Sequence, residues 1–308
     1  SAAEVTTLYN ENSLVASYRF EGNANDDMRA YDGTATNVTY EYGLGFTPDF
    51  VWYKTRTQAY DHNLSDSTRG AAKQVRPNRT IAEVSATDQI LSFDTGGFTV
   101  GSGGDANKDG DDYVAWCLKA NGGTTSSNTD GSITTTVQAN QDSGFSIIKY
   151  DMNVTSATAF TIGHGLSAAP ELVFFFSLDQ SGSTSNIVYP NNPNKEIVLD
   201  NTGGFSGATS AYWNTTAPSS TVINMGTAWG QYYSYYGGDT IAYAFHSVEG
   251  FSKIGSYTGN SSDNGPIVET GFEPAFLMIK NSSDLGSWFM YDNKRNTSSP
   301  RINYVLAN

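Results

Sequence analysis

One pattern recurs along this chain of 308 residues and limits the folds open to it. A proline followed by an apolar, strand-like run occurs at Pro48–Lys54, Pro170–Phe176 and Pro274–Lys280. A second pattern, an aspartate leading into apolar, alanine and aromatic residues, occurs at Asp112–Trp116 and again at Asp239–Tyr243. Self-similarity over long spacings is typical of chains built from one repeated structural unit. The chain is therefore predicted to contain several copies of one unit.

Glycine–phenylalanine pairs at Gly144 and Gly250 are expected to open the second and third copies. The segment from Gly122 to Ser143 is rich in Thr, Ser, Asn and Gly, which predicts a linker with one short strand at Ile133–Val137. The predicted domains are residues 1–122 for the first copy, 123–249 for the linker and second copy, and 250–308 for the start of an incomplete third copy.

The composition predicts an all-β fold with very little helix. Apolar runs are short, rich in aromatic and β-branched residues, and bounded by Gly, Asn, Asp or Pro, which is the pattern of strands joined by tight turns. Ser, Thr and Asn also compete with helical backbone hydrogen bonds. Helix is expected only at Ala2–Glu11, with one turn near Ser67–Lys73. We expect tandem β-sandwich modules of jelly-roll or concanavalin-A-like type, each burying its own core.

Charge and motifs exclude several functions. A formal net charge of −14 disfavours nucleic acid and anionic membranes as partners, because both need clustered Lys and Arg. No apolar run is long enough to span a membrane. The histidines His62, His164 and His246 share no metal-ligand spacing, and no nucleophile-elbow, zinc-protease or phosphate-loop motif occurs. The single cysteine, Cys117, lies in an apolar run and is expected to be buried. These features predict that the chain is not an enzyme.

Two stretches resemble known families. Residues 14–26 and 33–40 resemble the opening of laminin-G-type, concanavalin-A-like modules, and residues 4–10 resemble the short helix that closes them; the remainder of that module does not follow, so no lectin activity is implied. From Gly43 onward, the proline-strand repeat with Asp66–Gly70 and Ser92–Phe98 is similar to repeats of tail-fibre and other virion appendage proteins of marine bacteriophages. This resemblance implies a β-sandwich protein on the exterior of a virion.

One acidic loop matches the first half of a calcium-binding loop. Oxygen-bearing residues alternate around a glycine turn, an arrangement that can surround a hard cation. The position of the usual bidentate glutamate is occupied by Trp116, so a solvated hairpin tip is the competing interpretation. The candidate ligands are Asp105, Asn107, Asp109 and Asp112. No other cofactor is expected.

The corresponding loop of the second copy is aromatic. Tyr and Trp rings suit sugar faces and protein interfaces, because an apolar plate carries a polar edge. Packing on a neighbouring module or subunit is the alternative to contact with a glycan or receptor. The candidate binding residues are Trp229, Tyr232, Tyr233, Tyr235 and Tyr236.

These observations predict a non-catalytic structural or adhesive virion protein, a tail fibre or a fibre attached to the capsid, outside the cell. Its expected partners are other virion proteins, further copies of itself in a trimer, and a host-surface glycan. Two alternatives stay open: a carbohydrate-binding or polysaccharide-degrading module, and a bacterial surface or adhesion protein.

Overall fold

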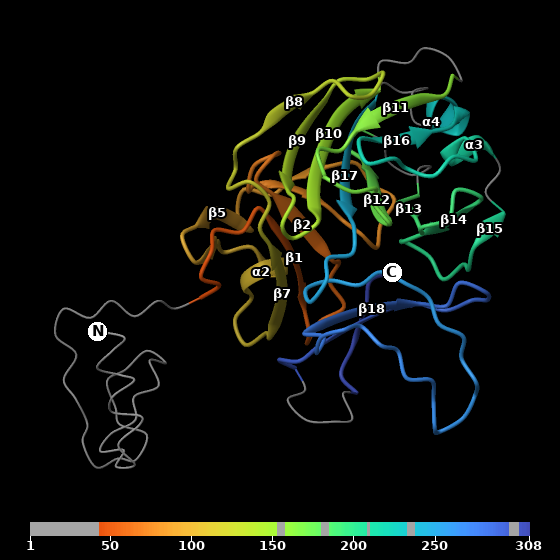
Figure 1. The fold of residues 1–308 in the computed structure, drawn as a ribbon. Coiled ribbons are helices and arrows are strands. Elements are labelled where there is room, and N and C mark those ends of the chain that lie inside the picture. Colours follow the sequence, from red (N-terminus) through yellow and green to blue (C-terminus); the bar gives the residue numbers. More distant parts are fainter. Residues whose placement is uncertain (1–42, 153–157, 180–184, 208–209, 233–237, 296–301) are drawn as a thin grey trace, which may run out of the picture.

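The computed structural model describes residues 43–152, 158–179, 185–207, 210–232, 238–295 and 302–308, and almost all regular structure in them is strand (Figure 1). The all-β prediction is confirmed. The described helices are single turns or little more: α2 (Gly104–Asn107), α3 (Ser210–Trp213) and α4 (Thr227–Tyr232). The expected helix at residues 2–11 and both stretches that resemble laminin-G modules lie outside the described residues. Residues 67–72 form turns.

The first copy forms a five-stranded antiparallel sheet in the order β4-β3-β2-β1-β7. A separate hairpin of two strands, β5 and β6, belongs to the same copy. The strands are β1 (Phe50–Thr55), β2 (Asn63–Asp66), β3 (Lys73–Val75), β4 (Val84–Ser85), β5 (Ile90–Asp94), β6 (Gly97–Val100) and β7 (Tyr113–Leu118).

The second copy forms an eight-stranded sheet in the order β15-β14-β13-β12-β17-β10-β9-β8, with β11 and β16 as a separate pair. The predicted linker is part of this sheet: its polar residues form β8 and β9, which extend the sheet beside β10. The strands are β8 (Ser126–Asn128), β9 (Thr135–Asn140), β10 (Phe145–Met152), β11 (Phe160–Gly163), β12 (Leu172–Ser177), β13 (Ile187–Tyr189), β14 (Lys195–Val198), β15 (Ser206–Gly207), β16 (Val222–Met225) and β17 (Gly238–Phe245).

The third copy forms a three-stranded sheet of β18 (Phe276–Lys280), β19 (Trp288–Asp292) and β20 (Val305–Leu306). Its glycine–phenylalanine pair does not open a strand as the equivalent pair opens β10. Gly250 lies in a turn with a φ of 73°, and Ser252 makes only an isolated bridge to Val248.

Strand pairing repeats residue for residue between the first two copies. The strands after the prolines, β1 and β12, pair with β7 and β17, which we call the closing strands. Phe50 lies opposite Leu118, and Leu172 lies opposite Phe245. The acid after each proline repeats its bonds too, as the Asp49 N–H donates to the Leu118 carbonyl (2.9 Å) and the Glu171 N–H to that of Phe245 (2.7 Å).

Three equivalent meanders of three strands can therefore be defined: β1-β2-β3, β12-β13-β14 and β18-β19-β20. In the first and third, the residue opposite the start of the leading strand is an aspartate: Phe50 faces Asp66, and Phe276 faces Asp292. The first and second meanders each continue into a closing strand on the free side of the leading strand. Among the described residues, no strand pairs with that side of β18.

The three meanders pack on one common hydrophobic cluster, which we call the shared core. Equivalent positions of all three contribute to it: Leu64, Val188 and Met290 from the middle strands, and Val75, Ile197 and Val305 from the last strands. Aromatic rings also bridge the copies, since Trp52 lies 6.4 Å from Phe174 and Phe174 lies 6.3 Å from Trp288. The expectation that each module buries its core by itself does not hold for this cluster, because it contains residues of all three copies.

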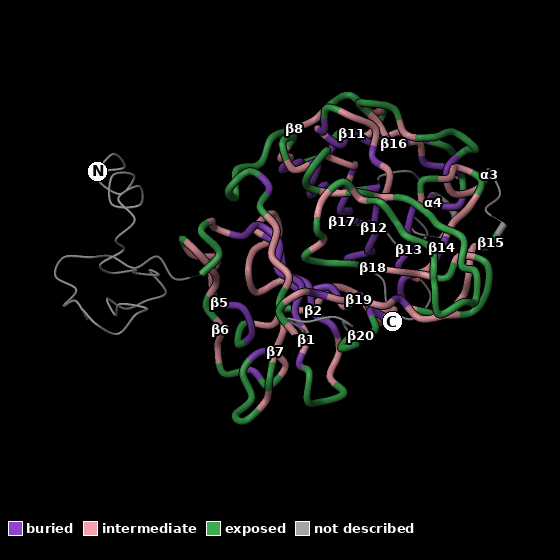
Figure 2. The backbone as a smooth tube through the Cα atoms, turned by 60° about the horizontal axis from the view of Figure 1, so that its bottom comes forward, coloured by how far each residue is buried: buried purple, intermediate pink, exposed green. Residues whose placement is uncertain are grey.

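In the first two meanders, the leading strand is buried on both faces, because its side chains point alternately to the shared core and to a second cluster. On β1, Phe50 and Trp52 face the shared core while Val51 and Tyr53 face a small cluster closed by β5, β6 and α2. On β12, the opposite face joins a larger cluster closed by β11, β16, α3 and α4. Side chains of a strand point alternately to its two faces, so a strand buried on both faces reads as a continuous apolar run. Figure 2 shows β18, β19 and β20 next to the first two copies.

Candidate functional site

The candidate calcium ligands are not gathered around one point. Asp105 lies in α2 with its carboxylate 3.4 Å from the Arg76 guanidinium, and the Asn107 amide donates to the Gly101 carbonyl. Asp109 and Asp112 are exposed. Residues 104–107 turn as helix, which breaks the alternation that a cation loop requires. In the part of the chain that the structure describes, no three His, Cys, Asp or Glu side chains are placed to hold a metal ion.

The candidate aromatic loop divides into two parts. Trp229 lies in α4 and is fully buried: its ring is 4.8 Å from that of Phe175, and its indole N–H donates to the Tyr212 carbonyl (2.8 Å). The sequence made Trp229 a candidate binding residue, but its ring is buried and does not face solvent. Tyr232 ends the same helix, and Tyr233, Tyr235 and Tyr236 lie outside the described residues.

Among the described residues, the histidines and the cysteine form no cluster that could hold a metal ion. His62 accepts a hydrogen bond from the Trp52 indole (2.9 Å), and burial lowers the pKa of His62 to about 4. His164 accepts from the Leu166 N–H, so its other ring nitrogen donates to the Ser219 carbonyl, and burial lowers its pKa to about 4. Burial raises the pKa of Cys117 to about 12, which leaves its thiol protonated and unreactive at neutral pH.

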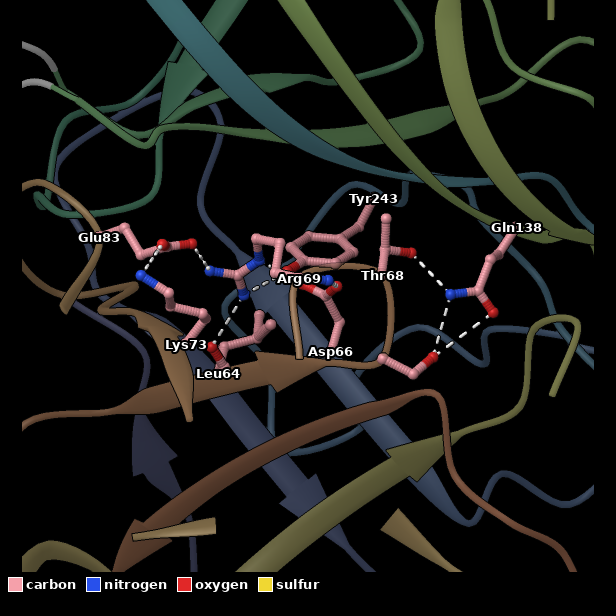
Figure 3. Close-up of polar contacts among 9 residues, drawn as sticks. Leu64, Asp66, Thr68, Arg69, Lys73, Glu83, Gln138 and Tyr243 are labelled. Carbon is pink, nitrogen blue, oxygen red and sulfur yellow. Dashed lines mark hydrogen bonds and ion pairs between the residues drawn. The ribbon is translucent and has the colours of Figure 1, made fainter. Parts of the chain in front are cut away.

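A buried ionic cluster joins the first two copies (Figure 3). At the corner after β2, Arg69 donates to Asp66 (2.5 Å) and to Glu83 (3.0 Å), and its side chain is only 1% exposed. From the second copy, the Tyr243 hydroxyl donates to Asp66 (2.7 Å) and accepts from Arg69 (3.1 Å). Burial by itself would lower the pKa of Arg69, but Asp66 and its other anionic neighbours outweigh it and raise that pKa. The cluster therefore fixes one copy against the next.

The third copy repeats this corner. Arg295 donates to Asp292 through its side chain (2.6 Å) and its backbone N–H (2.9 Å), and to the Met290 carbonyl (2.9 Å). Burial would raise the pKa of Asp292, but the bonds from Arg295 outweigh it and lower that pKa. The Arg295 guanidinium lies 5.6 Å from the ring of Trp116, which occupies in β7 the position that Tyr243 occupies in β17. The corners of the first and third copies thus each meet the aromatic residue of a neighbouring copy's closing strand.

The best candidate for an interaction site is the face of the third meander that points away from the shared core, which we call the outer face. Phe289, Tyr291 and Tyr304 form a ring cluster there, with centroids 4.9 Å apart for Phe289 and Tyr304 and 5.7 Å apart for Tyr291 and Tyr304. Leu277 lies opposite Tyr291 on the same face. Leu277 is 41% exposed and Tyr304 is 49% exposed.

The outer face differs from the same face of the other meanders. Val51 and Val173, which correspond to Leu277, are both fully buried under the additional layers of their copies. The sequence analysis did not select these residues. The alternation in Trp288–Asp292, with Trp288 and Met290 buried and Phe289 and Tyr291 between them, was the available signal. A contiguous exposed apolar surface marks an interaction site more often than a scattered apolar residue does.

The comparisons with known proteins identify a family but no activity. The model of a domain of unknown function, DUF7483, matches residues 25–308. The chain belongs to this family. No curated protein and no solved structure matches it. Among the helices described in this DUF7483 chain, none is long and apolar enough to cross a membrane.

Proposed function

We propose that this DUF7483 chain is a non-catalytic structural protein of a phage virion, a fibre or an appendage on the particle exterior, and that its outer face contacts a neighbouring virion subunit. The observation that carries the proposal is the outer face itself: three aromatic rings and Leu277 lie on a sheet face that is covered in both other copies. Aromatic residues are enriched at the centres of protein interfaces, where they bury a large area at low entropic cost.

The resemblance to virion appendage repeats supports the proposal independently. The repeat has the properties of a spacer, because three meanders keep one pairing register while the segments between their strands differ.

Two measurements test this function. Mass spectrometry of purified virions from the source is expected to detect the chain, and gold-labelled antibodies against it are expected to decorate an appendage. In sedimentation, the protein is expected to self-associate or to bind a second virion protein, and the double variant Tyr291→Ala/Tyr304→Ala is expected to weaken this association by at least tenfold. Particles that lack the chain, or association unchanged in the double variant, would overturn the proposal.

A second candidate is glycan contact, and the half-exposed Tyr304 of the outer face favours it. Tyr304 presents a half-exposed ring beside Tyr291, and such rings can stack on sugar faces. A glycan array decides between the two. Saturable binding that Tyr291→Ala abolishes, without a change in the association state, would favour the glycan. Loss of polysaccharide viscosity during incubation would indicate a degrading enzyme and contradict both candidates.

A further inference from the structure

The third meander has an open edge at the position where the other two meanders have a partner strand. The leading strands β1 and β12 lie between two neighbours, a middle strand on one side and a closing strand on the other. The leading strand β18 pairs with β19 alone among the described residues. An unpaired edge presents a row of backbone N–H and C=O groups that can template a further strand.

The first side chain of β18 is more exposed than its counterparts in the other leading strands. Phe276 is 41% exposed, whereas the equivalent Phe50 is 4% exposed and the equivalent Leu172 is partly buried. Tyr243 of β17 is a buried member of the shared core, and Trp116 and Leu118 of β7 pack against it; among the described residues, no closing strand of a third copy adds an aromatic residue.

We propose that the free edge of β18 binds, in antiparallel orientation, an extended strand of the closing type, Asp-x-apolar-Ala-aromatic, supplied from outside the described residues. The pattern is read from the two strands that fill this position elsewhere, Asp112–Leu118 and Asp239–Phe245. Both strands are engaged by their own copies, so neither can fill the third position. Strand addition of this kind takes its affinity from main-chain bonds and its specificity from alternate side chains.

The order of contacts around the shared core predicts where the aromatic residue of the added strand lies. The corner of the first meander meets Tyr243 in the second copy, and the corner of the third meander meets Trp116 in the first copy. The corner of the second meander, at residues 190–193, is the remaining one, and no closing-strand aromatic residue has been assigned to it. The aromatic side chain of the bound strand is therefore placed beside this corner, where Pro190 and Pro193 are half-buried.

A peptide supplied in trans tests the proposal, and the test does not depend on the proposed function. The probe is a fluorescent peptide with the sequence of residues 238–247 and two added lysines for solubility. Saturable binding with one peptide per chain is expected, with slower amide hydrogen exchange at residues 276–280. The control peptide carries proline at the position of Ala242, which removes a backbone donor, and is expected to bind at least tenfold more weakly.

Matched variants of the protein locate the site. Leu277→Lys places a charge on the edge strand and is expected to weaken peptide binding at least tenfold, while Leu285→Lys, at a residue that is 73% exposed in a loop, is expected to leave it unchanged. No saturation up to about 1 mM, equal binding by Leu277→Lys, or exchange protection at β12 in place of β18 would each overturn the proposal.

Discussion

The corners after β2 and after β19 carry the same aspartate–arginine pair in two different surroundings. In the first, Arg69 is covered by the Tyr243 hydroxyl and also pairs with Glu83. In the third, Arg295 lies against the ring of Trp116, and Asp292 is its one ion-pair partner among the described residues. Both corners contain the same aspartate–arginine motif, but the residue that the neighbouring copy places beside it determines how much the ion pair contributes to stability. A closing strand that offers a hydroxyl builds a network, and one that offers an indole builds a cation–π contact.

The largest effect is expected at the first corner. Arg69→Leu leaves Asp66 buried without its cation and removes one of the two cationic partners of Glu83, which keeps Lys73, and breaking a buried pair from one side costs about 3–5 kcal/mol. Arg295→Leu is expected to cost less, because Arg295 has no equivalent of Glu83 among the described residues and the side chains of Arg295 and Asp292 (4% and 7% exposed) are less deeply buried than those of Arg69 and Asp66 (1% and 0%). Urea unfolding of both variants measures the difference. Equal losses would show that the two surroundings are energetically equivalent.

Lowering the pH is expected to destabilise the first meander through His62, but not the third meander, where Trp288 occupies the equivalent position. The pKa of His62 is about 4 in the fold against 6.5 in the unfolded chain, so the unfolded state binds the proton first. The contribution of neutral His62 to the free energy of unfolding is fully present above about pH 6.5. It falls by roughly 2–3 kcal/mol as the pH drops toward 4.

The matched pair for this test is His62 and Trp288, which occupy the same place in their meanders. His62→Gln keeps an acceptor for the Trp52 indole and is expected to flatten the pH dependence, leaving the part due to His164. Trp288→Phe is expected to lower stability by the same amount at each pH. An unchanged pH slope in His62→Gln would contradict the assignment.

A smaller effect is expected from the aromatic residues of the closing strands. Tyr243→Phe removes one hydroxyl that bonds both Asp66 and Arg69 and is expected to cost about 1–2 kcal/mol. Trp116→Phe keeps a ring beside Arg295 and is expected to cost about 1 kcal/mol or less. Thermal unfolding of the two single variants measures which one loses more stability. A larger loss in Trp116→Phe than in Tyr243→Phe would mean that the Tyr243 hydroxyl contributes little to stability.

The smallest effect is expected on the outer face. Leu277→Ala alters a half-exposed side chain and is expected to change the stability of the isolated protein by no more than about 0.5 kcal/mol. Val173→Ala, at the equivalent buried position, is expected to cost about 2 kcal/mol. Calorimetry of both variants checks this. A large loss in Leu277→Ala would show that the outer face is already covered in solution.

Much of the fold was accessible from pattern alone. The proline-led runs became β1, β12 and β18, and the aspartate-led runs became β7 and β17, because continuous apolar segments bounded by turn residues have few alternatives to a buried strand. The polar segment at residues 122–143 was harder. Its β8 and β9 are held by main-chain bonds to the sheet, which do not depend on apolar side chains.

The candidate sites were less predictable than the fold. The acidic loop has the alternation of a cation site, yet its first residues form α2 and Asp105 pairs with Arg76. Trp229 lies in an aromatic-rich stretch that predicts an exposed loop. In the structure, the short helix α4 directs its ring towards Phe175 and Trp213. Loop conformation depends on long-range packing that no local window contains.

The sequence by itself determined the all-β class and the repeated proline-led and aspartate-led runs that form strands, since these depend on local composition and on spacing. Only the tertiary structure decided that three units share one core, that equivalent corners meet the closing strands of neighbouring copies, and that one meander keeps an uncovered face and an open edge. The physical reason is that burial belongs to a side chain and its neighbours together: Val51, Val173 and Leu277 are near-equivalents in sequence, and only the layers packed against them make two buried and one exposed.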